Sequence, residues 1–404
     1  MINKNEARRV IIATSTFPRH KNDVVPRFIL DYAKAIKNIG IIPLVVAPHC
    51  KGLSLYDNIE GIDVYRFRYA PDFLEKLSYG AGIISNIKRN PFISLTIPFF
   101  IISQALKIRA LVKKTKPSIV HAHWVLPQAI STSIATIGLN VDNILTMHGS
   151  DLDLVKKGIF RQIRRWLLKP FKYVTVVSSP MQTELEKLAC VLPSRILVAP
   201  MGIPDIFFSQ HSAPIKRNNN ILCVGRLVKQ KNPIHVLIAF HQAKAQLPAD
   251  TKLIFLGEGP EKTILQRYID KYSLANFVEL RGYRSHSQLA ELYRTSKVIA
   301  HAADNEGLGL AILEAMASGL APIVPDFPAS KDYISNNVNG FVYPKGNIEE
   351  LSMLLIKVLS CDNTLHELSE NARTTANLYS WSSCARKYAS IYDASSSKDR
   401  LNEY

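Results

Sequence analysis

Residues 301–324 read HAADNEGLGLAILEAMASGLAPIV, and this stretch decides the fold. A β-rich run ends in it, Glu306 stands just before a helical pattern, and Glu314 follows eight residues later. Eight residues are about 2.2 helical turns, so a glutamate at the mouth of a helix and one along it can share a face. Gly307 and Gly309 are expected to expose backbone N–H groups at the helix start, where the helix dipole favours an anion. The third glycine of a dinucleotide fingerprint is missing, so the glycines alone are a weak signal.

Two other segments carry groups that suit a nucleoside diphosphate. CVGRLVKQKN (223–232) places Arg226 and Lys231 in the loop after a β-rich run, and LIFLGEGPEKTIL (253–265) places two glycines after the next one. Open α/β sheets bind ligands at the carboxyl ends of their strands, so these groups are expected at one edge. A leaving diphosphate needs fixed positive groups where no metal serves it. Each feature is common by itself, but their order and spacing together predict a nucleotide-sugar site.

Outward from these segments, short β-rich runs alternate with helical stretches along the chain. This alternation predicts βαβ units with mostly parallel sheets. The rhythm pauses before the polar tract at 211–220, so we expect one domain over 1–205 and a second over 206–384. The expected strands are 10–16, 42–48, 62–67, 118–124, 143–149, 173–179, 221–227, 252–259, 276–283, 297–304, 321–326 and 339–344.

The composition is that of a globular protein with a basic first half. Hydrophobic residues make up 47% of the 404 residues and charged residues 21%, which excludes a disordered chain. Residues 1–205 hold 28 Lys and Arg against 14 Asp and Glu, a net +14 of the total +17. A basic half indicates an anionic partner or a solubilising surface. Five unpatterned cysteines and a first apolar run too short for a signal peptide predict a cytoplasmic protein.

One apolar stretch leaves two interpretations open. Residues 91–114 contain Pro98 and several polar residues, and their apolar core is shorter than the roughly 20 residues of a membrane span. Residues 159–172 interleave Arg and Lys with large apolar residues. The two segments can form a basic amphipathic surface on an anionic membrane, which would make the protein peripheral at its inner face. Equally, they can be core-facing helices with solvated cationic faces.

The motifs resemble those of glycosyltransferase family 4. The family signature, two glutamates separated by seven residues, stands here as E-GLGLAIL-E at 306–314. The family's G-R-L…K element appears at 225–231 and its G-x-G-P element at 257–260. The resemblance extends over nearly the whole chain and is strongest from 221 to 344. It implies an α/β protein of GT-B fold, in which two Rossmann-like domains with parallel sheets face a central cleft. The C-terminal helix, about 385–404, would join the N-terminal domain.

The resemblance also implies a retaining glycosyltransferase that moves a hexose-type sugar from a nucleotide-sugar donor to a glycan or lipid-linked acceptor. Cell-surface polysaccharide or lipopolysaccharide biosynthesis would be its setting, and no cofactor and no metal are expected. Arg226 and Lys231 would stabilise the leaving diphosphate, and Glu306 would contact the donor sugar. His148, in TMHGSD at 146–151, would bond a sugar hydroxyl. The expected donor-binding residues are Glu314 at the ribose, Gly307, Leu308, Gly309 and Leu310 at the sugar, Gly257 and Gly259, and Tyr283 at the nucleobase.

The chain departs from the family's pattern after its first strand. Many members carry a Gly-Gly loop there, whereas this chain reads STFPRHKNDVVPRF (15–28) with no glycine. Arg19, Lys21 and Asp23 are therefore candidates for acceptor contacts, together with Asp151. The D-x-D at 151–153 spells the metal motif of the other major glycosyltransferase fold, but its fold context differs. Neither it nor the H-x-H at 121–123 is interpreted as a metal site.

Other functions of the same scaffold stay open at this point. A sugar-nucleotide epimerase or a phosphorylase can share the fold, although no cofactor-lysine site of a phosphorylase is found. A basic nucleic-acid- or membrane-binding protein on a GT-B scaffold is the alternative that the charged first half suggests. The sequence has no recognisable reading helix or RNA-binding motif, so nucleic acid is not an expected partner. Donor binding is expected to close the two domains about a hinge at 205–220.

Overall fold

The structure is a computed structural model that describes residues 8–21, 23, 27–80, 82–208 and 217–396. It divides into two compact units. Unit 1 is Met1–Gly202 with Cys384–Tyr404, and unit 2 is Ile203–Ser383. The sequence places its boundaries a few residues away, at 205/206 and 384/385. Part of the predicted hinge (209–216) and the end of the predicted C-terminal helix (397–404) lie outside the described residues.

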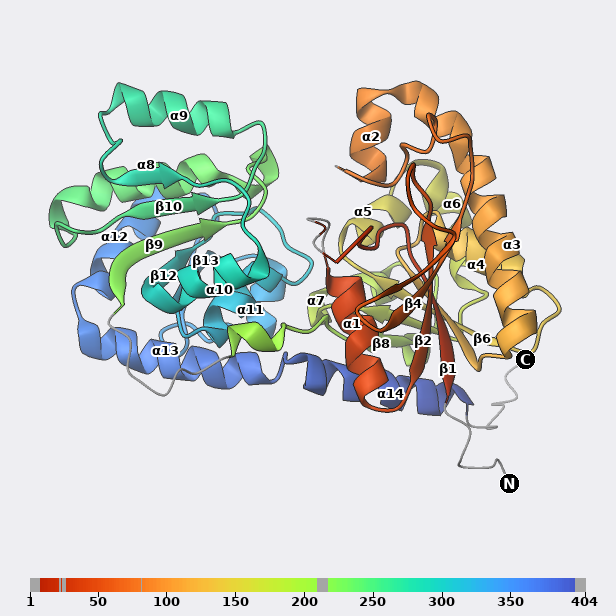
Figure 1. The fold of residues 1–404 in the computed structure, drawn as a ribbon. Coiled ribbons are helices and arrows are strands. Elements are labelled where there is room, and N and C mark those ends of the chain that lie inside the picture. Colours follow the sequence, from red (N-terminus) through yellow and green to blue (C-terminus); the bar gives the residue numbers. More distant parts are fainter. Residues whose placement is uncertain (1–7, 22, 24–26, 81, 209–216, 397–404) are drawn as a thin grey trace. The chain divides into compact units, whose positions relative to one another are not determined.

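Unit 1 is built on an eight-stranded sheet in the order β3-β4-β2-β1-β5-β6-β7-β8 (Figure 1). All neighbouring strands pair in parallel except β3 with β4. The central strand β5 is buried along its length and β1 is buried from Val10 onward, as expected of a parallel sheet covered on both faces. The strands are β1 (Arg9–Ala13), β2 (Ile42–Pro48), β3 (Tyr56–Ile59), β4 (Ile62–Phe67), β5 (Ile119–His123), β6 (Asp142–Met147), β7 (Tyr173–Val176) and β8 (Ile196–Val198).

The strands of unit 1 are joined by helices that bury one apolar side against the sheet. In α1 the buried residues include Ile29, Ala33 and Ile36, which are spaced by one helical turn. The last helix, α14 (Trp381–Ser396), packs on this unit from Cys384 onward, and Tyr388 donates a hydrogen bond to the Ala199 carbonyl at 2.8 Å. The other helices are α1 (Phe28–Asn38), α2 (Ile83–Arg89), η1 (Pro91–Thr96), α3 (Ile97–Thr115), α4 (Gln128–Thr136), α5 (Ser150–Val155), α6 (Gly158–Leu168), α7 (Ser179–Lys187) and η2 (Pro193–Arg195).

Unit 2 repeats the plan with a six-stranded, fully parallel sheet in the order β11-β10-β9-β12-β13-β14. Its strands are β9 (Asn218–Val224), β10 (Leu253–Leu256), β11 (Val278–Leu280), β12 (Ser296–Ala300), β13 (Ala321–Pro325) and β14 (Phe341–Tyr343). Its helices are η3 (Asp205–Phe207), η4 (Lys229–Lys231), α8 (Pro233–Ala243), η5 (Lys244–Gln246), α9 (Lys262–Lys271), α10 (His286–Thr295), α11 (Leu310–Ala317), η6 (Pro328–Asp332), α12 (Ile348–Leu359) and α13 (Asp362–Asn377).

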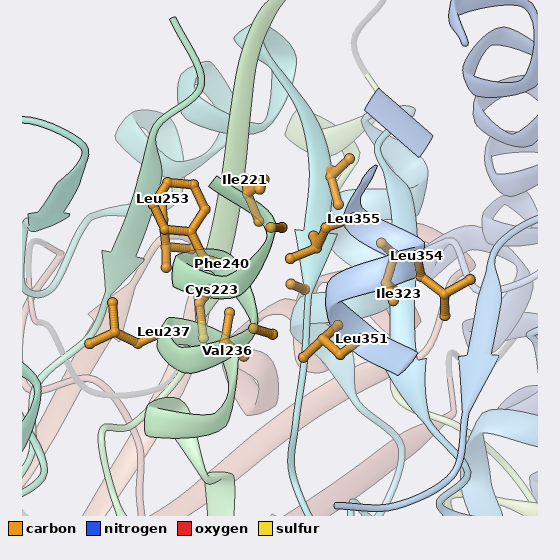
Figure 2. Close-up of a cluster of buried hydrophobic side chains, with 14 of the residues drawn as sticks. Ile221, Cys223, Val236, Leu237, Phe240, Leu253, Ile323, Leu351, Leu354 and Leu355 are labelled. Atoms are coloured by element: carbon orange, nitrogen blue, oxygen red, sulfur yellow. The ribbon is translucent and has the colours of Figure 1, made fainter. Parts of the chain in front are cut away.

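The core of unit 2 lies where α8 and α12 pack against the sheet. Figure 2 shows Phe240 of α8 beside Leu253 of β10, and Leu355 of α12 among the side chains of the central strands. These residues are fully buried, and each large apolar side chain removed from water stabilises the fold by about 1.5–3 kcal/mol. This packing fixes the strands whose carboxyl ends carry the predicted site.

Each sheet has one point where the strand order reverses. In unit 1, β1 lies between β2 and β5, and in unit 2, β9 lies between β10 and β12. The loops after β1 and β5, and those after β9 and β12, therefore leave their sheets in opposite directions. Such a switch point is the usual place for a ligand in an open α/β sheet.

Candidate functional site

An ion pair joins the two loops at the switch point of unit 2. Lys231 follows β9 in η4, and Glu306 lies between β12 and α11. The Lys231 ammonium pairs with the Glu306 carboxylate, and the Nε2 atom of His301 lies 2.9 Å from the same oxygen. The structure thus brings two predicted catalytic residues into contact and adds a histidine that the sequence did not single out.

The Glu306 carboxylate is held in its charged form. Burial by itself would raise its pKa, since water is excluded from most of the side chain. The hydrogen bond to His301 and the charge of Lys231 outweigh burial and lower the pKa of Glu306 to about 2. A carboxylate with so low a pKa accepts a proton poorly near neutral pH. Glu306 is therefore suited to orienting a hydroxyl or a cation rather than to acting as a general base.

The N-terminus of α11 stands next to this ion pair. Gly309 precedes the helix with a φ of +88°, and a Cβ atom there would lie 2.6 Å from the Tyr333 hydroxyl. That hydroxyl is buried, and it has no hydrogen-bond partner among the residues that the structure describes. The first amides of a helix have no acceptor within it and carry partial positive charge. Because residue 309 is a glycine, the Tyr333 hydroxyl can lie close to the N-terminus of α11.

The two glycines of the G-x-G-P segment serve close packing of loops. A Cβ atom on Gly257 would lie 1.9 Å from the Gly225 carbonyl oxygen, and one on Gly259 would lie 2.2 Å from that of Leu227. The Leu227 amide also donates to the Glu258 carbonyl at 3.0 Å. These contacts fix the loop that begins at Gly225, and a direct contact of Gly257 or Gly259 with the donor stays a prediction.

The remaining donor-side residues lie at the same edge of the unit 2 sheet or on α11. Arg226 is the second residue after β9, is exposed, and its guanidinium forms no ion pair with any residue within the described ranges. Tyr283, 51% exposed, follows β11. Leu310 is the first residue of α11, and Glu314 lies further along the helix. Glu306 lies before the helix, in a short loop. Leu308, in this loop, is buried.

A second polar group surrounds the switch point of unit 1. His148 follows β6, and its Nε2 atom lies 3.1 Å from Nδ1 of His123 at the end of β5. Asp151 accepts hydrogen bonds from the backbone amides of His148 and Val125, at 2.8 and 2.9 Å. Asp151 therefore ties the loops after β5 and β6 together. Trp124, with a φ of +74°, lies 4.7 Å from the His148 ring, centroid to centroid.

Burial keeps His121, His123 and His148 neutral near pH 7. It lowers the pKa of His148 to about 3 and that of His121 to about 3, and it lowers the pKa of His123 well below its ordinary value. Both nitrogens of His121 are engaged, with Tyr32 and Tyr392 on one side and Thr146 on the other. A neutral His148 can donate or accept one hydrogen bond with a hydroxyl, which is the role that the sequence predicts for it.

The loop after β1 is held by charges that satisfy one another. Arg19 forms a two-pronged ion pair with Asp23, with both N–O distances 2.7 Å, and the Asp23 side chain is buried. The buried guanidinium of Arg66 donates to the Pro18 carbonyl at 3.0 Å. Lys21 is exposed. Of the three acceptor-side candidates in this loop, Arg19 and Asp23 thus shape the loop, and Lys21 presents a charge to solvent.

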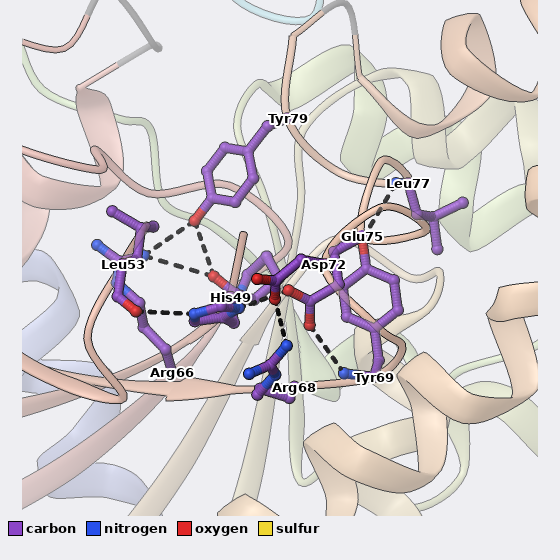
Figure 3. Close-up of polar contacts among 10 residues, drawn as sticks. His49, Leu53, Arg66, Arg68, Tyr69, Asp72, Glu75, Leu77 and Tyr79 are labelled. Carbon is purple, nitrogen blue, oxygen red and sulfur yellow. Dashed lines mark hydrogen bonds and ion pairs between the residues drawn. The ribbon is translucent and has the colours of Figure 1, made fainter. Parts of the chain in front are cut away.

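A polar cluster of unit 1 is formed by the segments that follow β2 and β4 (Figure 3). The side chains of His49, Asp72 and Glu75 are of kinds that bind metal ions, and their ligand atoms lie within 4.8 Å of one another. Both His49 nitrogens already make protein hydrogen bonds, to Glu75 and to the Leu53 carbonyl, and Asp72 pairs with Arg68. The cluster is therefore explained by protein contacts that fix the segment after β4.

Two family models together cover most of the chain. The model described as Glycosyl transferases group 1 matches residues 206–375, and that of Glycosyltransferase Family 4 matches residues 25–205. The chain belongs to glycosyltransferase family 4. The family 4 resemblance predicted from the motifs is confirmed, as is the prediction that the chain is a glycosyltransferase.

Relatives of this family 4 chain are distant, and several of them match most of its length. An uncharacterized glycosyltransferase of Methanocaldococcus jannaschii is 23% identical over 371 residues, which are 87% of this chain and 97% of that protein. The UDP-Gal:alpha-D-GlcNAc-diphosphoundecaprenol alpha-1,3-galactosyltransferase of Escherichia coli is 25% identical over 66% of this chain and 73% of its own. The solved structure of Anabaena HepE in complex with UDP and glucose has a TM-score of 0.72 at 16% identity, over 96% of this chain and 100% of that one. The predicted GT-B fold is thereby confirmed.

Sequence reasoning missed two residues of the candidate site in unit 2. His301 opens the decisive stretch, five residues before Glu306, and its place at the end of a strand was a usable signal. Tyr333 lies far along the chain in a loop after β13, and nothing in the local sequence points to Gly309. Only the folded chain brings its hydroxyl to the start of α11.

Proposed function

We propose that this glycosyltransferase transfers a hexose-type sugar from a nucleoside diphosphate donor with retention of configuration and without a metal. The acceptor is a glycan or a lipid-linked sugar of a cell-surface polysaccharide or lipopolysaccharide. A UDP-sugar is the first donor to test, because the Escherichia coli relative is named for UDP-Gal and the Anabaena structure contains UDP. The five free cysteines support a cytoplasmic location.

The observation that carries the proposal is the grouping at the unit 2 switch point. Lys231, Glu306 and His301 are in contact, and the start of α11 at Gly309 presents helix amides and the unpartnered Tyr333 hydroxyl. A diphosphate needs cations and N–H or O–H donors, whereas sugar hydroxyls need a carboxylate. Both kinds of group occur here.

The proposed mechanism follows from the charges of Arg226, Lys231 and Glu306. Arg226 and Lys231 stabilise the charge that develops on the leaving diphosphate, the task that a metal performs elsewhere. Glu306 stays a carboxylate, orients the donor sugar and holds Lys231 in place. Because its pKa is about 2, the departing diphosphate is the better base for the acceptor hydroxyl, which attacks the same face.

The stereochemistry tests this proposal directly. The purified chain, in excess EDTA, is given a UDP-hexose and a lipid-linked or soluble sugar acceptor, and the anomeric configuration of the product is determined by proton NMR. We expect product with the anomeric configuration of the donor. An inverted product, or transfer only after a divalent metal is added back, would refute the proposed chemistry. Release of an isomerised nucleotide sugar would instead identify an epimerase.

A further inference from the structure

The helix α3 and the turn before it carry a ridge of exposed apolar side chains. Leu95, Phe99, Ile102 and Leu106 are exposed by 69%, 61%, 53% and 63%, and Phe92 before them by 81%. Their spacing of four, three and four residues places the last four along one stripe of helical surface. An apolar stripe of this length on the surface of a globular domain marks a binding surface.

The opposite side of α3 is fixed in the core of unit 1. Phe100, Ala105 and Ile108 are buried in one cluster with strands of the sheet, and the buried Gln104 donates to the Thr14 carbonyl at 3.2 Å. The prediction that this stretch is too short for a membrane span was wrong, because the helical stretch 91–115 is long and apolar enough to cross a membrane by length and composition. Its buried side nevertheless belongs to the fold of the unit, so the apolar side that remains can lie on a membrane without crossing it.

The chain segment that carries the ridge has charges of one sign. Residues 76–141 contain eight Lys and Arg and no Asp or Glu. Lys113 and Lys114 are exposed in the last turn of α3, and Lys88 and Arg89 are exposed at the end of α2, which contacts η1. Cations beside an apolar stripe match a surface that is anionic outside and apolar within.

We propose that the ridge Phe92–Leu106 docks this unit on the surface of an anionic lipid bilayer. The apolar side chains enter the boundary between head groups and acyl chains, and the flanking lysines and arginines meet anionic head groups. A second copy of the chain is the weaker occupant, because two such surfaces would bring like charges together. Exposed Ile137 extends the surface, since Arg109 of α3 donates to its carbonyl at 2.8 Å. This inference concerns the surface of unit 1 and does not depend on the sugar transferred.

Vesicle binding tests the proposal without any transfer reaction. The full chain is sedimented with vesicles of phosphatidylcholine containing about 30% phosphatidylglycerol, and with vesicles of phosphatidylcholine alone. We expect binding to the anionic vesicles, weakened by high salt, and at least a roughly tenfold lower partition for a Phe99→Ser/Leu106→Ser variant. A Lys113→Gln/Lys114→Gln variant, which leaves the apolar stripe intact, should lose part of the preference for anionic lipid.

The matched control replaces two exposed apolar residues of unit 2, Met353 and Leu378, with serine. This variant should bind vesicles like the unchanged protein, and circular dichroism should show all variants folded. Equal partition of the ridge variant and the control, or no binding by the unchanged chain, would overturn the proposal. A dimer in sedimentation velocity that only the ridge variant loses would assign the ridge to a second copy instead.

Discussion

Glu306→Gln removes the negative charge at the centre of the unit 2 site and keeps the size of the side chain. The pKa of Glu306 falls from 4.5 to about 2, which at about 1.4 kcal/mol per pH unit means that its partners favour the charged form by about 3 kcal/mol. The side chain is 15% exposed, so solvent screens this interaction little. We expect the variant to lose up to about 3 kcal/mol of unfolding free energy at pH 7.

The loss should depend on pH in one direction. A carboxylate with a lowered pKa in the folded state stabilises above pH 4.5, and this contribution declines as the pH falls toward 2. Urea denaturation of both proteins from pH 7.5 to pH 3.5 should show the difference shrinking to about 2 kcal/mol at the acid end. Glu258→Gln, at an exposed pair with Lys262, is the control and should change stability by about 0.5 kcal/mol or less. A Glu306→Gln variant as stable as the parent at pH 7 would refute the assigned role of the ion pair.

Three other changes test separate parts of the site. Gly309→Ala should destabilise the protein by about 1–3 kcal/mol, because the new Cβ would lie 2.6 Å from the Tyr333 hydroxyl and φ at this position is +88°. The variant should also show a smaller donor-induced rise in melting temperature. An unchanged melting temperature and an unchanged donor response would contradict this prediction. Arg226→Ala should lower kcat by about 10²-fold in a radiolabelled-sugar transfer assay, whereas wild-type turnover would remove Arg226 from catalysis. Burial lowers the pKa of His123, so below pH 6.5 this histidine is protonated in the unfolded chain before it is protonated in the folded one. Unfolding free energy, measured in urea, should therefore fall less steeply between pH 7.5 and 5.5 in His123→Gln than in the parent. An unchanged slope would refute the buried neutral state of His123.

The sequence predicts the elements whose local pattern is strong. Strands at 42–48 and 62–67 match β2 and β4, because both are short segments rich in Ile, Val, Tyr or Phe, which are enriched in strands. The sequence does not predict β3, which is an edge strand of mixed polarity. The chain turns from β3 into β4 through Glu60 and Gly61, both of which have positive φ. A Glu-Gly pair is a weak hairpin signal beside Asn-Gly or Asp-Gly.

The site follows the same rule. Lys231 and Glu306 were found because each follows a strand in a recognisable motif, and the strand order that brings them together is a property of βαβ topology. The partners His301 and Tyr333 could not be assigned, since their roles depend on where side chains of distant segments meet. The close approach of Gly257 to Gly225 likewise cannot be predicted from the sequence, because it depends on how two distant loops pack together.

Donor binding in the absence of metal tests the central claim most directly. Thermal unfolding is followed with UDP-, GDP- and ADP-sugars in EDTA for the parent chain, for Arg226→Ala and Glu314→Ala, and for Arg267→Ala, an exposed arginine on α9, as control. A diphosphate site at the unit 2 switch point predicts a clear rise with one nucleotide for the parent and the control, and little or none for the two site variants. An equal rise in all four proteins would place the donor elsewhere and contradict the assignment.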